Sequence, residues 1–100
     1  MSITLCRKDD ILPEEIKRVE LADGRALAIY RLGDEFFATD DLCTHGQAML
    51  SEGMIEGEQV VCPYHLGTFD IRTGVPTGAP CTIALRTYAL RIEDGALLVE

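Results

Sequence analysis

The sequence predicts an all-β protein, an antiparallel sandwich or small barrel built as one domain. Short segments of β-type residues recur along the chain, turn-forming residues separate them, and only one short stretch favours a helix. A length of 100 residues fits one domain, so we expect residues 1–100 to form a single unit.

The expected strands follow from their composition and from the turns between them. Asp-Gly pairs at 23–24 and 94–95 each separate two apolar-rich segments, which is typical of a hairpin turn. The helical candidate is 9–15, where Asp10 is suited to capping a turn and Pro13 limits its length. The expected strands are residues 16–21, 25–31, 35–39, 54–56, 59–62, 68–71, 87–92 and 96–99.

Composition excludes several classes of partner. The net charge of −8 argues against nucleic acid and against an anionic membrane surface, both of which attract basic proteins. No segment approaches the roughly 20 apolar residues of a membrane helix, and the N-terminus lacks a basic region followed by an apolar one. We therefore expect a soluble cytoplasmic protein, whose acidic charge serves either solubility alone or the attraction of partners with basic surfaces.

Two motifs concentrate the metal-binding chemistry. Cys43 and His45 form a C-x-H motif, and Cys62 and His65 form a C-x-x-H motif after residues 46–61. The chain has 2 histidines, and both lie inside these motifs. Two thiolates and two imidazoles are the ligand set of a Rieske-type [2Fe–2S] centre, in which histidine replaces cysteine on one of the two irons.

A zinc site is the alternative, because zinc accepts the same four donors. Zinc fingers, however, usually pair cysteine with cysteine and histidine with histidine along the chain, whereas each motif here is mixed. A dinuclear cluster requires donors from both loops on both irons, so the pattern favours iron–sulfur chemistry. We assign Cys43 and Cys62 to one iron, and His45 and His65 to the other.

Both motifs fall in expected loops, with the 54–56 and 59–62 hairpin between them. This hairpin is expected to support a small cluster-binding subdomain of about residues 41–81 and to hold the loops side by side. Cys6 and Cys81 lie outside the motifs and are interpreted as free, partly buried apolar side chains. Asp40 and Asp41 are interpreted as part of a solvated face.

The chain resembles the Rieske family, and most closely the small ferredoxins of bacterial aromatic-ring-hydroxylating dioxygenases. The resemblance covers nearly the whole chain and rests on residues 43–46 and 62–70, with support from 71–74, from the closing hairpin 88–99, and from 78–80, which is similar to the proline loop that covers the cluster. It implies an electron carrier with one [2Fe–2S] cluster, reduced by an NAD(P)H-dependent flavoprotein reductase and oxidised by a terminal oxygenase. A Rieske small subunit like that of assimilatory nitrite reductases is the alternative, and a zinc-stabilised interaction module is a third.

Departures from other Rieske proteins predict a low reduction potential. Respiratory Rieske proteins carry a serine and a tyrosine whose hydroxyls donate toward the cluster, at positions where this chain has Gly67 and Phe69. They also carry a disulfide that Tyr64 at the matching position precludes. Fewer donors stabilise the reduced state less, so we expect a potential of about −150 mV. No histidine remains for a 2-His-1-carboxylate iron site, so the chain is not expected to be the oxygenase or an enzyme in its own right.

Overall fold

The computed structural model describes residues 2–44, 48–64, 66–79 and 81–99. Short strands dominate this part of the chain, and its helical segments are single 3₁₀ turns. The elements in chain order are β1 (Ile3–Arg7), η1 (Lys8–Asp10), β2 (Ile16–Glu20), β3 (Ala26–Leu32), β4 (Glu35–Asp40), η2 (Leu50–Glu52), β5 (Met54–Glu56), β6 (Gln59–Val61), β7 (Thr68–Asp70), β8 (Pro76–Gly78), β9 (Thr87–Tyr88), β10 (Leu90–Glu93) and β11 (Ala96–Val99).

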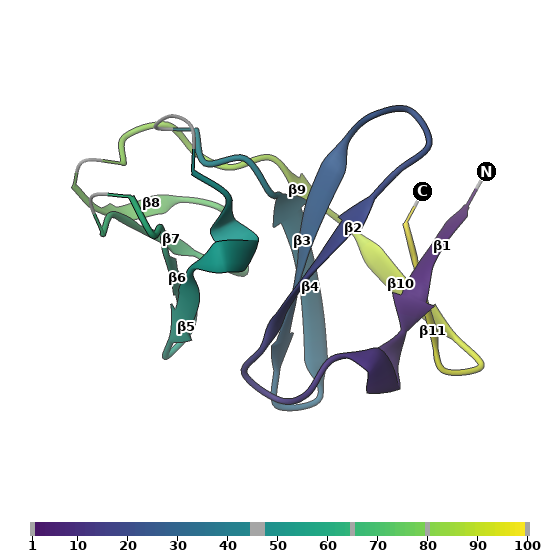
Figure 1. Ribbon diagram of the computed structural model, residues 1–100. Helices are drawn as coiled ribbons and strands as arrows, with labels where there is room; N and C mark the ends of the chain where they lie inside the picture. The colour runs from purple at the N-terminus through teal and green to yellow at the C-terminus, as the bar shows by residue number, and fades with distance from the viewer. Residues whose placement is uncertain (1, 45–47, 65, 80, 100) are drawn as a thin grey trace.

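The described strands form three antiparallel sheets, which confirms the predicted fold class. Their strand orders are β1-β11-β10, β2-β3-β4-β9 and β5-β6-β7-β8. Figure 1 shows the β2-β3-β4-β9 sheet between the other two, with β5–β8 at one end of the molecule and β1, β10 and β11 at the other. We call these the middle, loop-side and outer sheets.

Strand β3 of the middle sheet is buried on both faces, and its sequence shows why. Leu27 and Ile29 face one core while Ala28 and Tyr30 face the other, and all four are 0% exposed. Successive side chains of a strand point to opposite faces, so an uninterrupted apolar run suits a strand covered on both sides. One strand thereby contributes to both hydrophobic cores.

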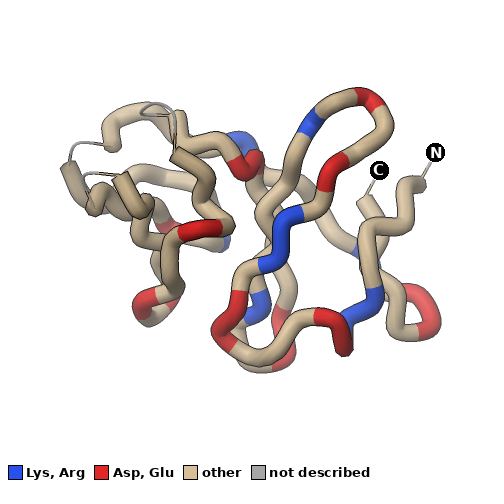
Figure 2. Tube along the Cα trace, viewed as in Figure 1, with Lys and Arg blue, Asp and Glu red and all other residues tan. Residues whose placement is uncertain are grey.

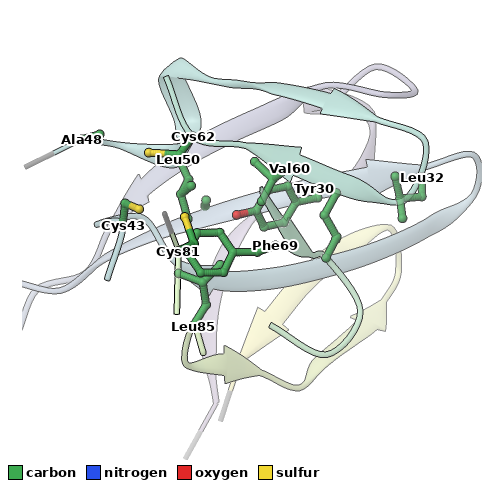
Figure 3. Close-up of a cluster of buried hydrophobic side chains, with 12 residues drawn as sticks. Tyr30, Leu32, Cys43, Ala48, Leu50, Val60, Cys62, Phe69, Cys81 and Leu85 are labelled. Atoms are coloured by element: carbon green, nitrogen blue, oxygen red, sulfur yellow. The ribbon is translucent and has the colours of Figure 1, made fainter. Parts of the chain in front are cut away.

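The two cores hold the three sheets together. The basal core lies between the outer and middle sheets and contains Ile11, Leu21, Leu27, Ile29, Ala38, Leu97 and Val99. The loop-side core lies between the middle and loop-side sheets and contains Ala28, Tyr30, Leu32, Cys43, Ala48, Leu50, Val60, Cys62, Phe69, Ile71, Cys81 and Leu85. Three of the four cysteines therefore belong to one core, on the side of the two motifs (Figure 3).

Arg72 joins the loop-side sheet to the middle sheet at the surface. Its Nη2 lies 2.8 Å from Glu35 Oε1, and its guanidinium carbon lies 4.9 Å from the ring centroid of Phe37. Glu58 in the loop-side hairpin pairs with the same guanidinium. Because these ion pairs are exposed, we expect them to fix orientation more than to add stability.

The expected strand 87–92 is divided in the structure. β9 pairs with β4 in the middle sheet, β10 pairs with β11 in the outer sheet, and Ala89 lies between them. The chain passes from one layer to the next at this residue. Alternation along the sequence reports which side chains share a face but not which partner strand they meet.

The structure also differs from the sequence prediction in two strands and in one helix. β1 and β8 were not expected; β8 includes Pro76 and Gly78, which are depleted in strands and tolerated at a sheet edge such as this. The helix expected at 9–15 is wrong, since the 3₁₀ turn η1 ends at Asp10, whose carboxylate accepts the Arg7 N–H at 2.9 Å.

In the described part of the chain, no helix has the length and apolar character needed to cross a bilayer.

Truncating the basal core should lower stability without affecting the loop-side core. Leu97 is 0% exposed, so Leu97→Ala should cost about 2–5 kcal/mol in the free energy of unfolding, measured with urea. Leu12 is 61% exposed, so the matched Leu12→Ala should change stability by less than about 0.5 kcal/mol. Equal losses of stability in the two variants would contradict the assignment of Leu97 to the basal core.

Candidate metal centre

The first motif lies in a loop that leaves β4 and returns at η2. The Cys43 N–H donates to the Ala48 carbonyl at 2.9 Å, and the Leu50 N–H donates to the Asp41 carbonyl at 2.7 Å. These two bonds pair the outgoing and returning backbone at the base of the loop. Cys43 is therefore held at a fixed backbone position, where it is 2% exposed.

The second motif lies in the connection from β6 to β7 and is closed in the same way. The Cys62 N–H donates to the Gly67 carbonyl at 2.8 Å, and Cys62 is 0% exposed. Leu66 has φ of 58°, in the left-handed region that leucine rarely adopts. The close return from Cys62 to Gly67 thus includes a strained residue at the surface.

Gly53 allows the two loops to pack closely. It follows η2, at the end of the first loop, and a Cβ built on it would lie 2.0 Å from the Val61 carbonyl oxygen, immediately before Cys62. Only glycine fits this approach without displacing β6. The requirement is for space, because its φ of −86° is open to any residue.

The two loops bring the thiols of Cys43 and Cys62 together. Burial raises the pKa of the Cys62 thiol, and its interaction with the Cys43 side chain raises it further. The Tyr64 backbone N–H donates to the Cys62 sulfur and opposes this shift. Two adjacent buried thiols, one with an N–H donor, are suited to a metal that binds them as thiolates, because a metal deprotonates its cysteine ligands.

Cys81 joins the same group of sulfur atoms. Figure 3 shows the three sulfur atoms at one end of the loop-side core, and the Cys81 side chain interacts with that of Cys43. Burial, followed by the nearby Cys43 thiol, raises the pKa of Cys81 to about 11. Cys81 is only 6% exposed and lies beside the cysteines of the two motifs. Its position in the sequence alone did not indicate this placement.

The segment that carries Cys81 also contacts the first loop. The Thr44 hydroxyl donates to the Ile83 carbonyl at 2.6 Å, and the Leu85 N–H donates to the Gly74 carbonyl at 2.8 Å. Thr44 is the residue between Cys43 and His45, so one side chain within the first motif ties its loop to the connection that follows β8. Three segments, and not two, thus surround the thiols.

Asp41 departs from the sequence interpretation as a solvated side chain. It is 1% exposed, and its Oδ2 accepts from Arg18 Nε at 2.9 Å. Its Oδ1 accepts the Ser51 N–H at 2.8 Å. The interpretation failed because the partner, Arg18, comes from a strand far away in the sequence.

Four of the residues singled out in the sequence lie outside the described residues: His45, Gly46, His65 and Pro80. Of the described candidates, Cys43 and Cys62 come together, whereas Cys6 lies half-buried on β1, against the basal core. Leu66 and Met49, which are apolar residues of the two loops, are 71% and 39% exposed.

The described donors fit an iron–sulfur cluster. Buried thiols on two closed loops, reached by a backbone N–H donor, provide what an iron–sulfur site needs on its cysteine side. Among the residues that the structure describes, no set of three histidine, cysteine or acidic side chains is arranged to hold a metal ion.

Comparison with known proteins identifies the class. A model of the Rieske [2Fe-2S] domain matches residues 1–89. The ferredoxin component of the p-cumate 2,3-dioxygenase system of Pseudomonas putida is 48% identical over 99 residues, 98% of this chain and 84% of that protein. The solved Sphingomonas yanoikuyae B1 ferredoxin is 40% identical with a TM-score of 0.96, covering 100% of this chain and 98% of its own.

A third similar structure is a complex. The ferredoxin in a complex of reduced oxygenase and oxidised ferredoxin in carbazole 1,9a-dioxygenase is 41% identical, with a TM-score of 0.93 over 98% of this chain and 91% of that one. A putative NADPH nitrite reductase small subunit is 24% identical with a TM-score of 0.84, a likeness that shows the fold alone.

This chain belongs to the Rieske [2Fe–2S] domain family, and within it to the ferredoxins. Its cofactor is a Rieske-type [2Fe–2S] cluster. Such proteins transfer electrons and do not themselves transform a substrate.

Cysteines outside the motifs should be dispensable for cluster binding. Cys6→Ser and Cys81→Ser should both retain two irons per chain and the visible absorption of the oxidised cluster, because neither supplies a donor in the predicted set. Cys6 serves as the remote control, since it packs against the basal core. Loss of iron from Cys81→Ser alone would show that the third thiol is needed to hold the cluster.

Proposed function

We propose that this protein is a cytoplasmic electron carrier for an aromatic-ring-hydroxylating dioxygenase. It accepts single electrons from an NAD(P)H-dependent flavoprotein reductase and delivers them to the terminal oxygenase. The relatives support this role, being ferredoxin components of dioxygenase systems acting on aromatic compounds such as p-cumate and naphthalene. Residues 41–81 act as the cluster-binding subdomain of a single domain.

The observation that carries the proposal is the meeting of Cys43 and Cys62 on two closed loops. These thiols bind one iron as thiolates, and His45 and His65, which accompany them in the two motifs, bind the other. When bound, the cluster supplies one-electron redox chemistry. The chain supplies the buried setting for the sulfur ligands and the Tyr64 N–H that donates to one of them.

The surroundings of the thiols support a low reduction potential. Phe69 is 0% exposed and packs in the loop-side core with Cys43 and Cys62, as Figure 3 shows. A phenyl ring has no hydroxyl to donate toward a sulfur. Fewer donors leave the more negative, reduced state less stabilised, which suits a carrier that must pass electrons onward.

An uncharged surface surrounds the metal centre and is suited to docking. Segments 42–51, 59–69 and 73–85 contain no Asp, Glu, Lys or Arg, although 26% of the chain is charged. Figure 2 shows most of the charged residues on the middle and outer sheets, while those of the loop-side part lie in η2, in the β5–β6 hairpin and at or just after the end of β7. The exposed apolar residues of these segments are Leu42, Met49, Tyr64, Leu66, Val75 and Ile83.

A shallow hollow beside the second loop adjoins this surface. It has a volume of about 220 Å³ and is lined by Glu52, Gly53 and Met54 on one side and by Val61, Pro63 and Leu66 on the other. Exposed apolar groups in contact with a hollow are typical of protein interfaces. We propose that the oxygenase binds here, because electron transfer requires the partner to approach the cluster.

Replacing either histidine should remove the Rieske signature. His45→Ala or His65→Ala should abolish the rhombic electron paramagnetic resonance signal of low average g that appears on reduction with dithionite. Thr44→Ser is the matched control within the first motif, because it keeps the hydroxyl that donates to Ile83. Survival of the signal in either histidine variant would refute the ligand assignment.

Replacing an exposed apolar residue beside the second loop should weaken docking. Leu66→Asn removes the apolar side chain, and asparagine tolerates the positive φ at this position. We expect affinity for the oxygenase to fall about tenfold, measured by calorimetry, with the cluster spectrum unchanged. Leu12→Asn, at a residue 61% exposed outside the loop-side sheet, should have no effect, and equal losses would locate the interface elsewhere.

A further inference from the structure

Asp41 is a buried carboxylate two residues before Cys43. Among the residues that the structure describes, it is the one charged side chain in the buried class, at 1% exposed. Acidic side chains are almost never fully buried unless they are paired, because removing a charge from water is costly. The position of this charge, at the start of the first loop, therefore calls for a physical explanation.

The carboxylate joins both ends of the loop to the middle sheet. Its Oδ1 accepts the Ser51 N–H from the returning end, at 2.8 Å, and its Oδ2 accepts from Arg18 Nε on β2, at 2.9 Å. The backbone of Asp41 contributes as well, since its N–H donates to the Ala26 carbonyl at 3.0 Å. One residue thus fixes the loop to two strands of the middle sheet.

Hydrogen bonding alone does not require a charge here, because a neutral amide could also accept from Ser51. Burying an ion pair is often no more stabilising than burying a neutral pair of the same shape. The ion pair is also unequal in its exposure. The Arg18 side chain is 37% exposed and shares its charge with Glu20 at the surface, whereas the Asp41 side chain is 1% exposed.

This asymmetry gives the negative charge the larger influence inside the protein. Water screens the guanidinium, whereas the carboxylate acts through a less polar medium. The buried Tyr30 hydroxyl is within electrostatic reach of both the Asp41 carboxylate and the Cys43 sulfur. The carboxylate and the first cysteine therefore share one buried neighbourhood.

We propose that Asp41 is a positioning residue for the first ligand loop and that its buried charge lowers the reduction potential of the cluster. The proposal rests on the ligand role of Cys43 given above. Reduction adds one negative charge at the cluster, and a fixed carboxylate nearby opposes that charge. Arg18 limits the effect and keeps the carboxylate compatible with burial.

The charge is tested by potentiometric titration of the holoprotein. Asp41→Asn should favour reduction at least threefold in the equilibrium constant, about 28 mV at 59 mV per tenfold change. The neutral pair Arg18→Gln with Asp41→Asn keeps hydrogen-bonding partners on both sides and should shift the potential in the same direction by less, because the guanidinium is lost as well. Glu20→Gln removes the exposed carboxylate that pairs with the same guanidinium and should leave the potential unchanged.

The positioning role is tested by cluster loss in the presence of an iron chelator. Asp41→Ala leaves the Ser51 N–H without its acceptor and should lose the visible absorption severalfold faster than Asp41→Asn. Ser51→Ala keeps its backbone N–H and is the matched control, with a rate expected to equal that of the wild type. Equal rates in the two Asp41 variants would overturn the positioning role.

A potential in Asp41→Asn equal to that of the wild type, with the paramagnetic signal unchanged, would overturn the electrostatic role. If the double variant folds and binds iron but has a lower reduction potential than the wild type, the proposed direction of the electrostatic effect is wrong. Failure of the ligand assignment is seen separately, as survival of the Rieske signal in His45→Ala or His65→Ala.

Discussion

The site depends on a backbone hydrogen bond that each proposed ligand cysteine makes within its own loop. Cys43 donates its N–H to Ala48, and Cys62 donates its N–H to Gly67, so both loops return to the residue that carries the sulfur. Neither bond involves the metal. The thiols can therefore be held at fixed positions by the protein alone, which reduces the entropy lost when a cluster binds. The Gly53 contact lets these two closed loops pack together, and the Thr44 hydroxyl ties the first loop to the segment that carries Cys81.

The fold and the main motifs could be predicted from the sequence because their signals are local. An Asp-Gly pair specifies its turn, and the apolar run around Ala28 specifies a strand buried on both faces. Asp41 and Cys81 could not be interpreted in this way. The burial of Asp41 depends on Arg18 in another strand, and the position of Cys81 depends on how the segment after β8 folds back over the first loop. For these two residues the decisive contacts are made with segments distant in sequence, and the residues around them do not indicate those contacts.

The charged residues are distributed unevenly between the two ends of the molecule. The basal part of the molecule carries most of the charged residues, while the three segments around the metal centre carry none. A net charge of −8 repels copies of the molecule from one another, and at the proposed docking surface the uncharged segments would let the partner approach closely without desolvating ions. On this proposal, charge repulsion and docking belong to different parts of one small protein.

The pairing of β1 with β11 has a practical consequence for surface chemistry. Ile3 pairs with Val99, and both strands belong to the sheet at the opposite end of the molecule from the metal centre (Figure 1). A linker attached beside either strand would orient the molecule with its redox group directed away from a solid support. A monolayer immobilised on an electrode through this end would consequently exchange electrons slowly with the electrode itself, while remaining open to dissolved oxygenase on its outer side.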